Sequence, residues 1–420
     1  MRYSSFLDLI TETARQVESG RTTDVAIDPK CGDAISDDFF GHRRMTRLGR
    51  AMTVKNRITT FTMRNVPVGP KGCGFLKRIL SNRHGPRVLV LEDTTRDGTE
   101  LAVALSECLS QNKTIEVLHL KANGIRSEGC AALGKMLASN NHLKELRLCH
   151  NLIGRDAAFR FGVGLADNTS LETLDLTGNS MDDGCVGAIC KGIHAHPTLT
   201  FLCLDFNNFS TKGVDAIAQM LVKNHMLRAL HLFGNHIKAD GGKLLAASLK
   251  RNYTLKTLIL SFNDLGDAGA AALAEALAVN TALEKLWLPA NHLGNAGLRA
   301  FAEYLPDMKS LKQLNVGDYF DNDGALPIRE SIQRNTELQV LYMESVLFDD
   351  ERVEEDIEFY LKANRAGRKL LQCNDDVPVS LWSNVLARAS QYGPDVQFFL
   401  LREKPDLFEE WTRRKADEPT

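Results

Sequence analysis

The sequence predicts a right-handed α/β solenoid, a horseshoe of about 11 repeats with a parallel β-sheet on its concave side and helices on its convex side. Three observations support this fold class. A motif of the form Leu-x-x-Leu-x-Leu-x-x-Asn-x-Leu recurs every 28 residues. In the residues that follow each motif in the sequence, the spacing of apolar residues changes from alternating to helical. The pattern also weakens toward both ends of the chain, as expected where terminal repeats must cap the array.

The repeated motif predicts the strands. Its leucines alternate with other side chains, so the leucines face the core and the residues between them face outward. Each motif asparagine follows a strand and is expected to turn inward, where its amide satisfies backbone groups of the loop. The motifs start at Ile115, Leu143, Leu171, Leu199, Leu227, Leu255 and Leu283. Their asparagines, which we interpret as a structural ladder, are Asn123, Asn151, Asn179, Asn207, Asn235, Asn263 and Asn291.

The second half of each unit predicts a helix. Gly269, Leu273 and Leu277 show the spacing, with a small residue where the helix start approaches its neighbour. Another asparagine stands three residues before the next motif, and we expect it to end the helix in a left-handed conformation. These asparagines are Asn112, Asn140, Asn168, Asn224, Asn252, Asn280 and Asn335. Adjacent strands lie about 4.8 Å apart, whereas adjacent helices lie about 8–10 Å apart. Because the helix side of each repeat is wider than the strand side, the stack of repeats must curve.

The weakened repeats set the expected boundaries. Degenerate units begin at Ile58 and Val88 upstream and at Leu311 and Leu338 downstream, so the repeat domain is predicted to span residues 58–348. Residues 1–57 are expected to form an N-terminal helical cap. Residues 349–420, which begin with an acidic stretch, are expected to form a C-terminal helical extension, either a cap on the last repeat or a separate binding module.

Composition argues for an intracellular protein that binds neither nucleic acid nor membrane. The net charge is −2 and the sequence pI is about 6.6, unlike a nucleic-acid or acidic-membrane binder. Nine cysteines without a Cys-x-x-Cys pair indicate reduced thiols in the cytoplasm or nucleus. The start of the chain does not resemble a signal peptide, and no run of 18 apolar residues predicts a membrane helix. We expect a monomer.

The repeat consensus resembles the ribonuclease-inhibitor-like subfamily of leucine-rich repeat proteins, over about 290 residues. That subfamily includes ribonuclease inhibitor, the RanGAP GTPase activators and the repeat domains of NOD-like receptors. The uniform 28-residue period is more similar to the last two groups. A whole NOD-like receptor is excluded because the chain has no Gly-x-x-x-x-Gly-Lys-Ser/Thr motif. The resemblance implies a scaffold that binds a protein partner, with no enzyme activity and no cofactor.

The resemblance to RanGAP implies an alternative function, activation of a small GTPase. Members of that family carry a catalytic arginine on a loop of an early repeat. Here Arg96 stands on the irregular loop Asp93–Gly98 of an early unit, although the Phe-Thr-Gly-Arg context of the family is absent. An arginine so placed would stabilise charge in the transition state of GTP hydrolysis.

A second alternative comes from the C-terminal extension. The segment Val377-Pro378-Val379-Ser380-Leu381-Trp382 and the residues up to Leu386 resemble the opening helix of an F-box. F-boxes normally precede the repeats, whereas this segment follows them. The resemblance implies a substrate adaptor of a ubiquitin ligase.

The sequence offers no evident catalytic set and no metal site. His194 and His196 stand near the end of a predicted helix, and we interpret them as part of a solvated helix terminus rather than as metal ligands. Cys149-His150 follows a strand without the further residues that a nucleophile would need.

The outward strand positions favour a partner-binding surface. Polar residues occupy these positions in the early units, whereas apolar and aromatic residues gather in the later ones. Exposed aromatic side chains grouped on one face are typical of binding hot spots. The alternative is that the C-terminal segment or neighbouring side chains bury them. The predicted partner-binding residues are Asp205, His231, Phe233, Ile259, Trp287 and Tyr342, with Phe206 and Phe262 one position beyond these columns.

Overall fold

The computed structural model describes residues 4–29, 36–54, 58–82, 85–317, 320–343, 352–369 and 379–402. The chain divides into two compact units, unit 1 (Met1–Ile237) and unit 2 (Lys238–Thr420), and each is described by itself. In both units, parallel strands alternate along the chain with helices. This arrangement confirms the predicted α/β solenoid.

The strands of unit 1 pair in chain order, each parallel to the next. From Val117 onward in this unit, a paired residue and its partner on the next strand are 28 residues apart in the chain, which is the length of one repeat. Leu146 therefore pairs with Leu174, and Leu174 pairs with Leu202. All three leucines are fully buried, as the motif predicts. The strands are β1 (Asp24–Ile27), β2 (Thr60–Arg64), β3 (Val88–Glu92), β4 (Val117–Lys121), β5 (Glu145–Arg147), β6 (Thr173–Asp175), β7 (Phe201–Cys203) and β8 (Ala229–His231).

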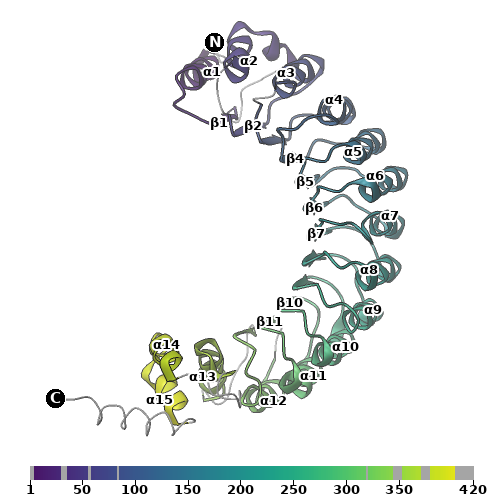
Figure 1. Cartoon of the computed structure of the whole chain (residues 1–420). Coiled ribbons are helices and arrows are strands. Elements are labelled where there is room, and N and C mark those ends of the chain that lie inside the picture. The colour runs from purple at the N-terminus through teal and green to yellow at the C-terminus, as the bar shows by residue number, and fades with distance from the viewer. Residues whose placement is uncertain are drawn as a thin grey trace, which may run out of the picture. The chain divides into compact units, whose positions relative to one another are not determined.

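The helices of unit 1 are α1 (Ser4–Glu18), α2 (Arg43–Val54), α3 (Pro70–Leu80), α4 (Thr99–Leu109), α5 (Ser127–Ser139), α6 (Arg155–Asp167), α7 (Asp183–Ile193) and α8 (Thr211–Lys223), with a short 3-10 helix, η1, at Asp37–Gly41. Within this unit the strands line the inner side of a curve and the helices line its outer side (Figure 1). Small residues let adjacent helices approach closely. A Cβ added at Gly164 of α6 would lie 1.9 Å from the carbonyl oxygen of Gly134 in α5.

Unit 2 repeats the same alternation. Its strands are β9 (Thr257–Ile259), β10 (Lys285–Trp287), β11 (Gln313–Asn315) and β12 (Val340–Tyr342), which pair in chain order and in parallel. Its helices are α9 (Ala239–Leu249), α10 (Gly266–Val279), α11 (Asn295–Tyr304), the short 3-10 helix η2 (Leu305–Asp307), α12 (Asn322–Ile332), α13 (Arg352–Ala366), α14 (Val379–Ser390) and α15 (Pro394–Arg402).

The motif asparagines form the predicted ladder of buried amides. Asn207 shows the pattern. Its Oδ1 accepts hydrogen bonds from the backbone N–H groups of Asn179 (3.1 Å) and Met181 (3.0 Å) in the preceding repeat. Its Nδ2 donates to the carbonyl oxygens of Leu176 (3.1 Å) and Leu204 (3.0 Å). Each amide therefore joins two repeats by satisfying backbone groups that would otherwise be buried without partners.

The second asparagine column has a different conformation from the predicted one. The backbone at Asn168 is extended, with φ −77° and ψ 141°, so the prediction of a left-handed helix end is wrong. The side chain closes the turn instead. Asn168 Oδ1 accepts from the N–H groups of Ser170 (3.0 Å) and Leu171 (2.8 Å), and Nδ2 donates to the carbonyl oxygen of Leu137 (2.8 Å). We call the buried side chains at this position the turn rungs.

One turn rung is a histidine. His196 is 2% exposed, and its Nδ1 accepts hydrogen bonds from the N–H groups of Thr198 (3.3 Å) and Leu199 (3.1 Å), like the oxygen of an asparagine rung. Burial lowers the pKa of His196 to about 4, because the charged ring would be desolvated. The interpretation of a solvated helix end fits the exposed His194 but is wrong for His196.

The ends of the chain extend the repeat pattern. Within residues 1–57 the predicted helix is α1, but this segment also contributes the strand β1, which pairs with β2. The strand was not predicted because Asp24–Ile27 is short and carries no motif. At the other end, Asn364 of α13 donates to the carbonyl oxygens of Asn335 (3.0 Å) and Leu338 (2.8 Å), so it serves as one more turn rung.

Helices α14 and α15 form a small cluster with α13. Ala366, Ala389, Val396 and Leu400 are buried together in this cluster. The first residues of the acidic stretch (349–351) and the start of the F-box-like segment (Val377 and Pro378) lie outside the described residues.

Candidate interaction surface

The strand side of unit 1 begins with a charged network. His119 on β4 lies with Nε2 2.8 Å from Glu145 Oε1 on β5, and Arg147 Nε donates to the same oxygen (2.7 Å). These groups alternate with the buried leucines, so they point away from the core. Because they are engaged with one another, they form a hydrated polar surface rather than an apolar contact area.

Further along unit 1, thiols and carboxylates come together. Thr177 Oγ1 donates to Asp175 Oδ1 (2.6 Å) and lies 3.1 Å from Cys203 Sγ. The backbone N–H of Phe233 donates to Asp205 Oδ1 (2.7 Å). Burial raises the pKa of Asp205, although hydrogen bonds from Cys203 and Phe233 act in the opposite direction.

Three potential metal ligands meet in this region. One ligand atom each of Cys203, Asp205 and His231 lies within 4.8 Å of the other two. The sequence alone predicts no metal site. Cys203 and His231 are 28 residues apart in the chain, and the parallel register makes them direct neighbours on β7 and β8.

The thiol at Cys149 is not a plausible nucleophile. Burial and the nearby carboxylate of Asp175 raise its pKa to about 12. A thiol with so high a pKa has almost no thiolate at neutral pH, and the thiolate is the reactive form.

An aromatic pair, Phe206 and Phe233, follows these polar groups in unit 1. Their ring centroids lie 4.8 Å apart in an edge-to-face arrangement. The side chain of Phe206 is 56% exposed, and the backbone of this residue is left-handed, with φ 51°. The repeats before and after it place Gly178 and Gly234 at the same position. The Phe206 ring covers Gly234, where an added Cβ would lie 2.7 Å from Phe206 Cδ1.

The strand side of unit 2 is more apolar. Trp287 is half-buried, and Lys285 Nζ lies 4.1 Å from the centroid of its ring. Phe262 and Tyr342 are 58% and 52% exposed. Ile259 is only 8% exposed, so it adds little to any surface that a partner could reach. The prediction that Ile259 is an accessible binding residue is therefore wrong.

Several polar atoms on this side of unit 2 are buried without a partner. Among the described residues, Ser261 Oγ, Trp287 Nε1 and Asn315 Oδ1 have no hydrogen-bond partner. Trp287 and Asn315 are neighbours in the register of β10 and β11. A buried polar atom without a partner lowers the stability of the fold by about 1–3 kcal/mol.

The predicted partner-binding residues therefore fall into two groups. Asp205, His231 and Phe233 lie together in unit 1. Ile259, Trp287 and Tyr342 are the last residues of β9, β10 and β12 in unit 2. Phe206 and Phe262, which stand one position beyond the predicted columns, are more than half exposed. Each of the two phenylalanines directly precedes a ladder asparagine in the sequence. This position could have identified them as exposed, because the asparagine side chain points into the core and the residue before it points outward.

The other candidate sites have less support in their geometry. Arg96 is exposed on the loop between β3 and α4, but β3 has paired strands on both sides and is not an open sheet edge. Val385 and Ala389 of α14, in or just beyond the F-box-like segment, pack into the cluster with α13 and α15. The side chains of residues 379–383 lie outside the described ones.

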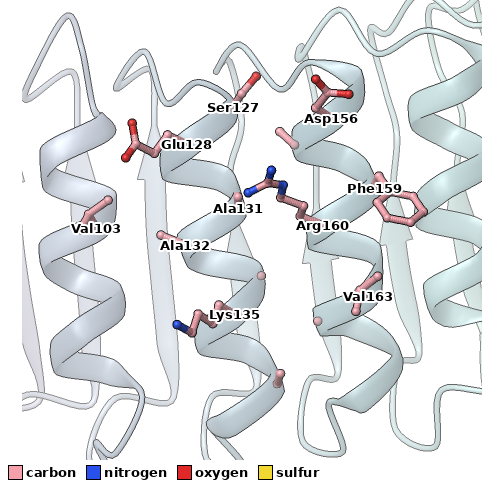
Figure 2. Close-up of a pocket in the computed structure, with 14 residues that line it drawn as sticks. Val103, Ser127, Glu128, Ala131, Ala132, Lys135, Asp156, Phe159, Arg160 and Val163 are labelled. Atoms are coloured by element: carbon pink, nitrogen blue, oxygen red, sulfur yellow. The ribbon is translucent and has the colours of Figure 1, made fainter.

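The helix side of unit 1 has an open groove of about 770 Å³ across α4, α5 and α6. Small side chains such as Ala131 and Ala132 line it, together with Val103, and Arg160 of α6 reaches toward α5 (Figure 2). Phe159 of α6 is 63% exposed at its margin. This surface carries no buried polar group that would orient a ligand.

Comparisons with known proteins support the repeat assignment. No helix in the described part of the chain is both long enough and apolar enough to cross a membrane. No curated protein matches the sequence. The family described as Leucine Rich repeat matches residues 111–134, 167–190, 195–218, 223–246 and 251–274. These matches, on strands and helices that repeat in register, show that the chain carries leucine-rich repeats of the α/β type.

Proposed function

We propose that this protein is an interaction scaffold that binds a protein partner on the strand side of its repeats and performs no chemistry itself. Leucine-rich repeats are typical protein-interaction scaffolds. The resemblance of the repeat consensus to the ribonuclease-inhibitor-like subfamily supports the same function. In unit 1 the contact surface is centred on Phe206 and Phe233, and in unit 2 on Trp287, Phe262 and Tyr342.

The observation that carries this proposal is the exposed aromatic ring of Phe206, which is 56% exposed and packs edge-to-face on Phe233. The left-handed backbone at this position belongs to the repeat, since Ala122, His150 and Phe262 share it. The solenoid does not require a large side chain there, because Gly178 and Gly234 occupy the same position in adjacent repeats. An exposed aromatic residue at a position that the fold leaves free is typical of a binding site.

The chemistry of the surface indicates what the partner presents. An apolar or aromatic side chain of the partner would pack on the edge-to-face pair of Phe206 and Phe233. A polar group beside it would meet Asp205 and His231, which lie directly next to the pair. Such an arrangement, an apolar centre with a polar margin, is the usual anatomy of a protein interface.

The test compares the two sides of unit 1. A partner is first captured with the wild-type chain and then produced in pure form, so that its dissociation constant can be measured. The double variant Phe206→Gly/Phe233→Ala should weaken binding by at least about 30-fold, as expected when a hot spot worth about 2 kcal/mol is lost. The matched control Phe159→Ala removes an exposed phenylalanine from the helix side and should leave the affinity unchanged.

Stability measurements separate loss of binding from loss of fold. Phe206→Gly alone should keep or raise the free energy of unfolding, because glycine adopts a positive φ without strain. If the double variant binds like the wild type while Phe159→Ala does not, the interaction surface lies on the helix side. If Phe206→Gly unfolds the protein, the phenylalanine is structural, and its exposure does not mark a binding site.

Activation of a small GTPase is the second candidate function, because Arg96 is exposed on a loop of an early repeat. In that case the wild-type chain would accelerate GTP hydrolysis by Ran, and Arg96→Ala would reduce the acceleration by orders of magnitude. We expect no acceleration by the wild-type chain. A clear rate enhancement that depends on Arg96 would replace the scaffold proposal.

A further inference from the structure

We propose that Cys203, Asp205 and His231 form a binding site for a divalent transition-metal ion, most suitably Zn²⁺, on the strand side of unit 1. The ligands would be one thiolate sulfur, one carboxylate oxygen and one imidazole nitrogen. A fourth position would remain for water or for a group from another molecule. This site shares Asp205 and His231 with the polar margin of the proposed partner surface but includes neither Phe206 nor Phe233, and metal binding can be measured without a partner.

The positions of the three side chains follow from the repeat. Cys203 and Asp205 are two residues apart and project from the same side of one repeat, and His231 is the register partner of Cys203 on the next strand. Their ligand atoms all lie within 4.8 Å of one another, with His231 Nδ1 4.0 Å from Asp205 Oδ2. Tetrahedral Zn²⁺ places such atoms about 3.3–3.6 Å apart, so small side-chain rotations would close the site.

Neighbouring groups already hold each ligand. The N–H of Phe233 donates to Asp205 Oδ1, while Oδ2 is the oxygen nearest to His231. Thr177 Oγ1 lies 3.1 Å from Cys203 Sγ. The ring of Phe201 packs edge-to-face against His231 with centroids 4.9 Å apart. Outer groups that orient the ligands in this way are a regular feature of metal sites.

The charge balance and the donor types favour a divalent ion. Among the described residues, the cation nearest Asp205 is His231, which is charged only when protonated. A carboxylate and a thiolate together neutralise the two positive charges of the ion, which suits a largely buried position. Sulfur and nitrogen donors select zinc and related metals over Mg²⁺ or Ca²⁺, which prefer oxygen ligands.

Binding of the ion involves a defined proton transfer. An ordinary cysteine thiol has a pKa of about 8.5, so Cys203 enters the reaction as a thiol near neutral pH. As the bond between sulfur and zinc forms, the S–H bond breaks and its proton passes to solvent. Neutral His231 contributes a lone pair, and Asp205 contributes its carboxylate. About one proton should therefore be released for each thiol that binds a metal ion near neutral pH.

The experiment uses the full chain with Cys31→Ser and Cys373→Ser, because these two thiols lie outside the described residues and could bind metal elsewhere. Co²⁺ is added as a spectroscopic probe, and Zn²⁺ is then titrated in competition with a coloured chelator. We expect one ion per chain and a charge-transfer absorption band from sulfur to cobalt. Calorimetry in two buffers with different ionisation enthalpies measures the released proton.

Variants then assign the ligands. Cys203→Ser should abolish the charge-transfer band, and Asp205→Asn and His231→Gln should each weaken Zn²⁺ binding by at least about 100-fold, more than the loss of a merely orienting group. Cys149→Ser, which removes another thiol from the same side of unit 1, should leave the band and the affinity unchanged. Phe206→Gly keeps all three ligands and should also bind zinc normally, so zinc binding is tested separately from the aromatic contact of the partner surface.

The proposal is wrong if the wild-type chain, shown to be folded by circular dichroism, does not bind Co²⁺ and does not take Zn²⁺ from the chelator. It is also wrong if the band persists in Cys203→Ser, because another thiol would then hold the ion. Should Cys203→Ser fail to fold, the nearly isosteric Asp205→Asn decides the question. An affinity equal to that of the wild type would exclude the site.

Discussion

The strand sides of the two units differ although their interiors are alike. In unit 1, polar side chains such as Glu145, Asp175 and Asp205 are engaged in hydrogen bonds, beside buried thiols and an aromatic pair. In unit 2, the same columns are more apolar, and Trp287 and Asn315 each bury a polar atom without a partner among the described residues. The repeat therefore determines the leucines and asparagines inside, whereas the outward columns are free to specify different surfaces.

The turn rungs show a similar contrast inside the fold. In unit 2, Asn252, Asn280 and Asn335 each accept hydrogen bonds from the turn that follows, and the buried Met308, which cannot be protonated, stands at the same position between the last two. In unit 1, His196 takes that place between Asn168 and Asn224. An asparagine rung is neutral at every pH, whereas a histidine rung can be protonated. The two units should therefore respond differently to acid.

The largest expected effect is a loss of stability on acidification that depends on His196. The folded pKa is about 4, below the ordinary value of 6.5, so the unfolded state binds the proton more readily. The contribution to stability is fully present above pH 6.5 and is lost as the pH falls from 6.5 to about 4. It amounts to on the order of 3 kcal/mol over this range. Urea denaturation at several pH values measures it.

Replacement of the histidine provides the control. His196→Asn should flatten this part of the pH profile and leave only the contribution of the carboxylates. The reciprocal variant Asn280→His should introduce a similar pH dependence into unit 2, where Asn280 now binds the carbonyl oxygens of Leu249 and Asn252. An unchanged profile in His196→Asn would show that the imidazole is hydrated in the folded state.

A smaller effect is expected from the ladder, where the two units should behave alike. Asn207→Ala in unit 1 and Asn291→Ala in unit 2 each leave buried backbone groups without a partner. Asn291 donates to the carbonyl oxygens of Leu260 (2.9 Å) and Leu288 (2.7 Å), in the same way as Asn207 does in its own repeat. Each variant should lose roughly 1–3 kcal/mol of stability.

Midpoints and slopes of denaturant unfolding provide this measurement, because long repeat arrays can unfold in more than one step. A loss confined to one of the two variants would contradict the equivalence of the interiors. It would also show that the outward side chains contribute to the stability of the ladder beneath them.

Much of the fold could be predicted because the buried positions obey one simple rule. The leucines of β5 to β8 and the ladder asparagines recur at a fixed interval, and each has a single structural role. The rung at His196 was misinterpreted, because a histidine suggests solvent or metal when its neighbours in space are unknown. Its role becomes evident only when the turn is compared with that at Asn168.

The candidate site was less predictable because exposure depends on contacts between repeats. Ile259 and Trp287 both occupy outward positions, but Ile259 is buried and Trp287 only partly so. The grouping of Cys203, Asp205 and His231 also depends on strand register, which brings residues 28 apart in the chain into one cluster. The alternation along a strand predicts the direction of a side chain but not which neighbours will cover it.

The smallest effect on stability, and the sharpest test of the contrast between the two strand sides, is expected from Trp287→Phe. Phenylalanine loses part of the buried ring area and weakens the contact with Lys285, which is worth about 0.5–1 kcal/mol at an exposed site. It also removes an indole N–H whose burial without a partner costs about 1–3 kcal/mol.

These contributions nearly cancel, so the free energy of unfolding of Trp287→Phe should change by less than about 1 kcal/mol. Binding should behave differently, because the half-buried ring of Trp287 offers a partner more contact area than phenylalanine does. Loss of that contact area should weaken the complex about tenfold, a change of about 1.4 kcal/mol. Reduced stability with unchanged affinity would instead mean that the N–H already has a partner, such as an ordered water. The unit 2 surface would then be as fully hydrogen-bonded as that of unit 1, and the contrast between the two strand sides would no longer hold.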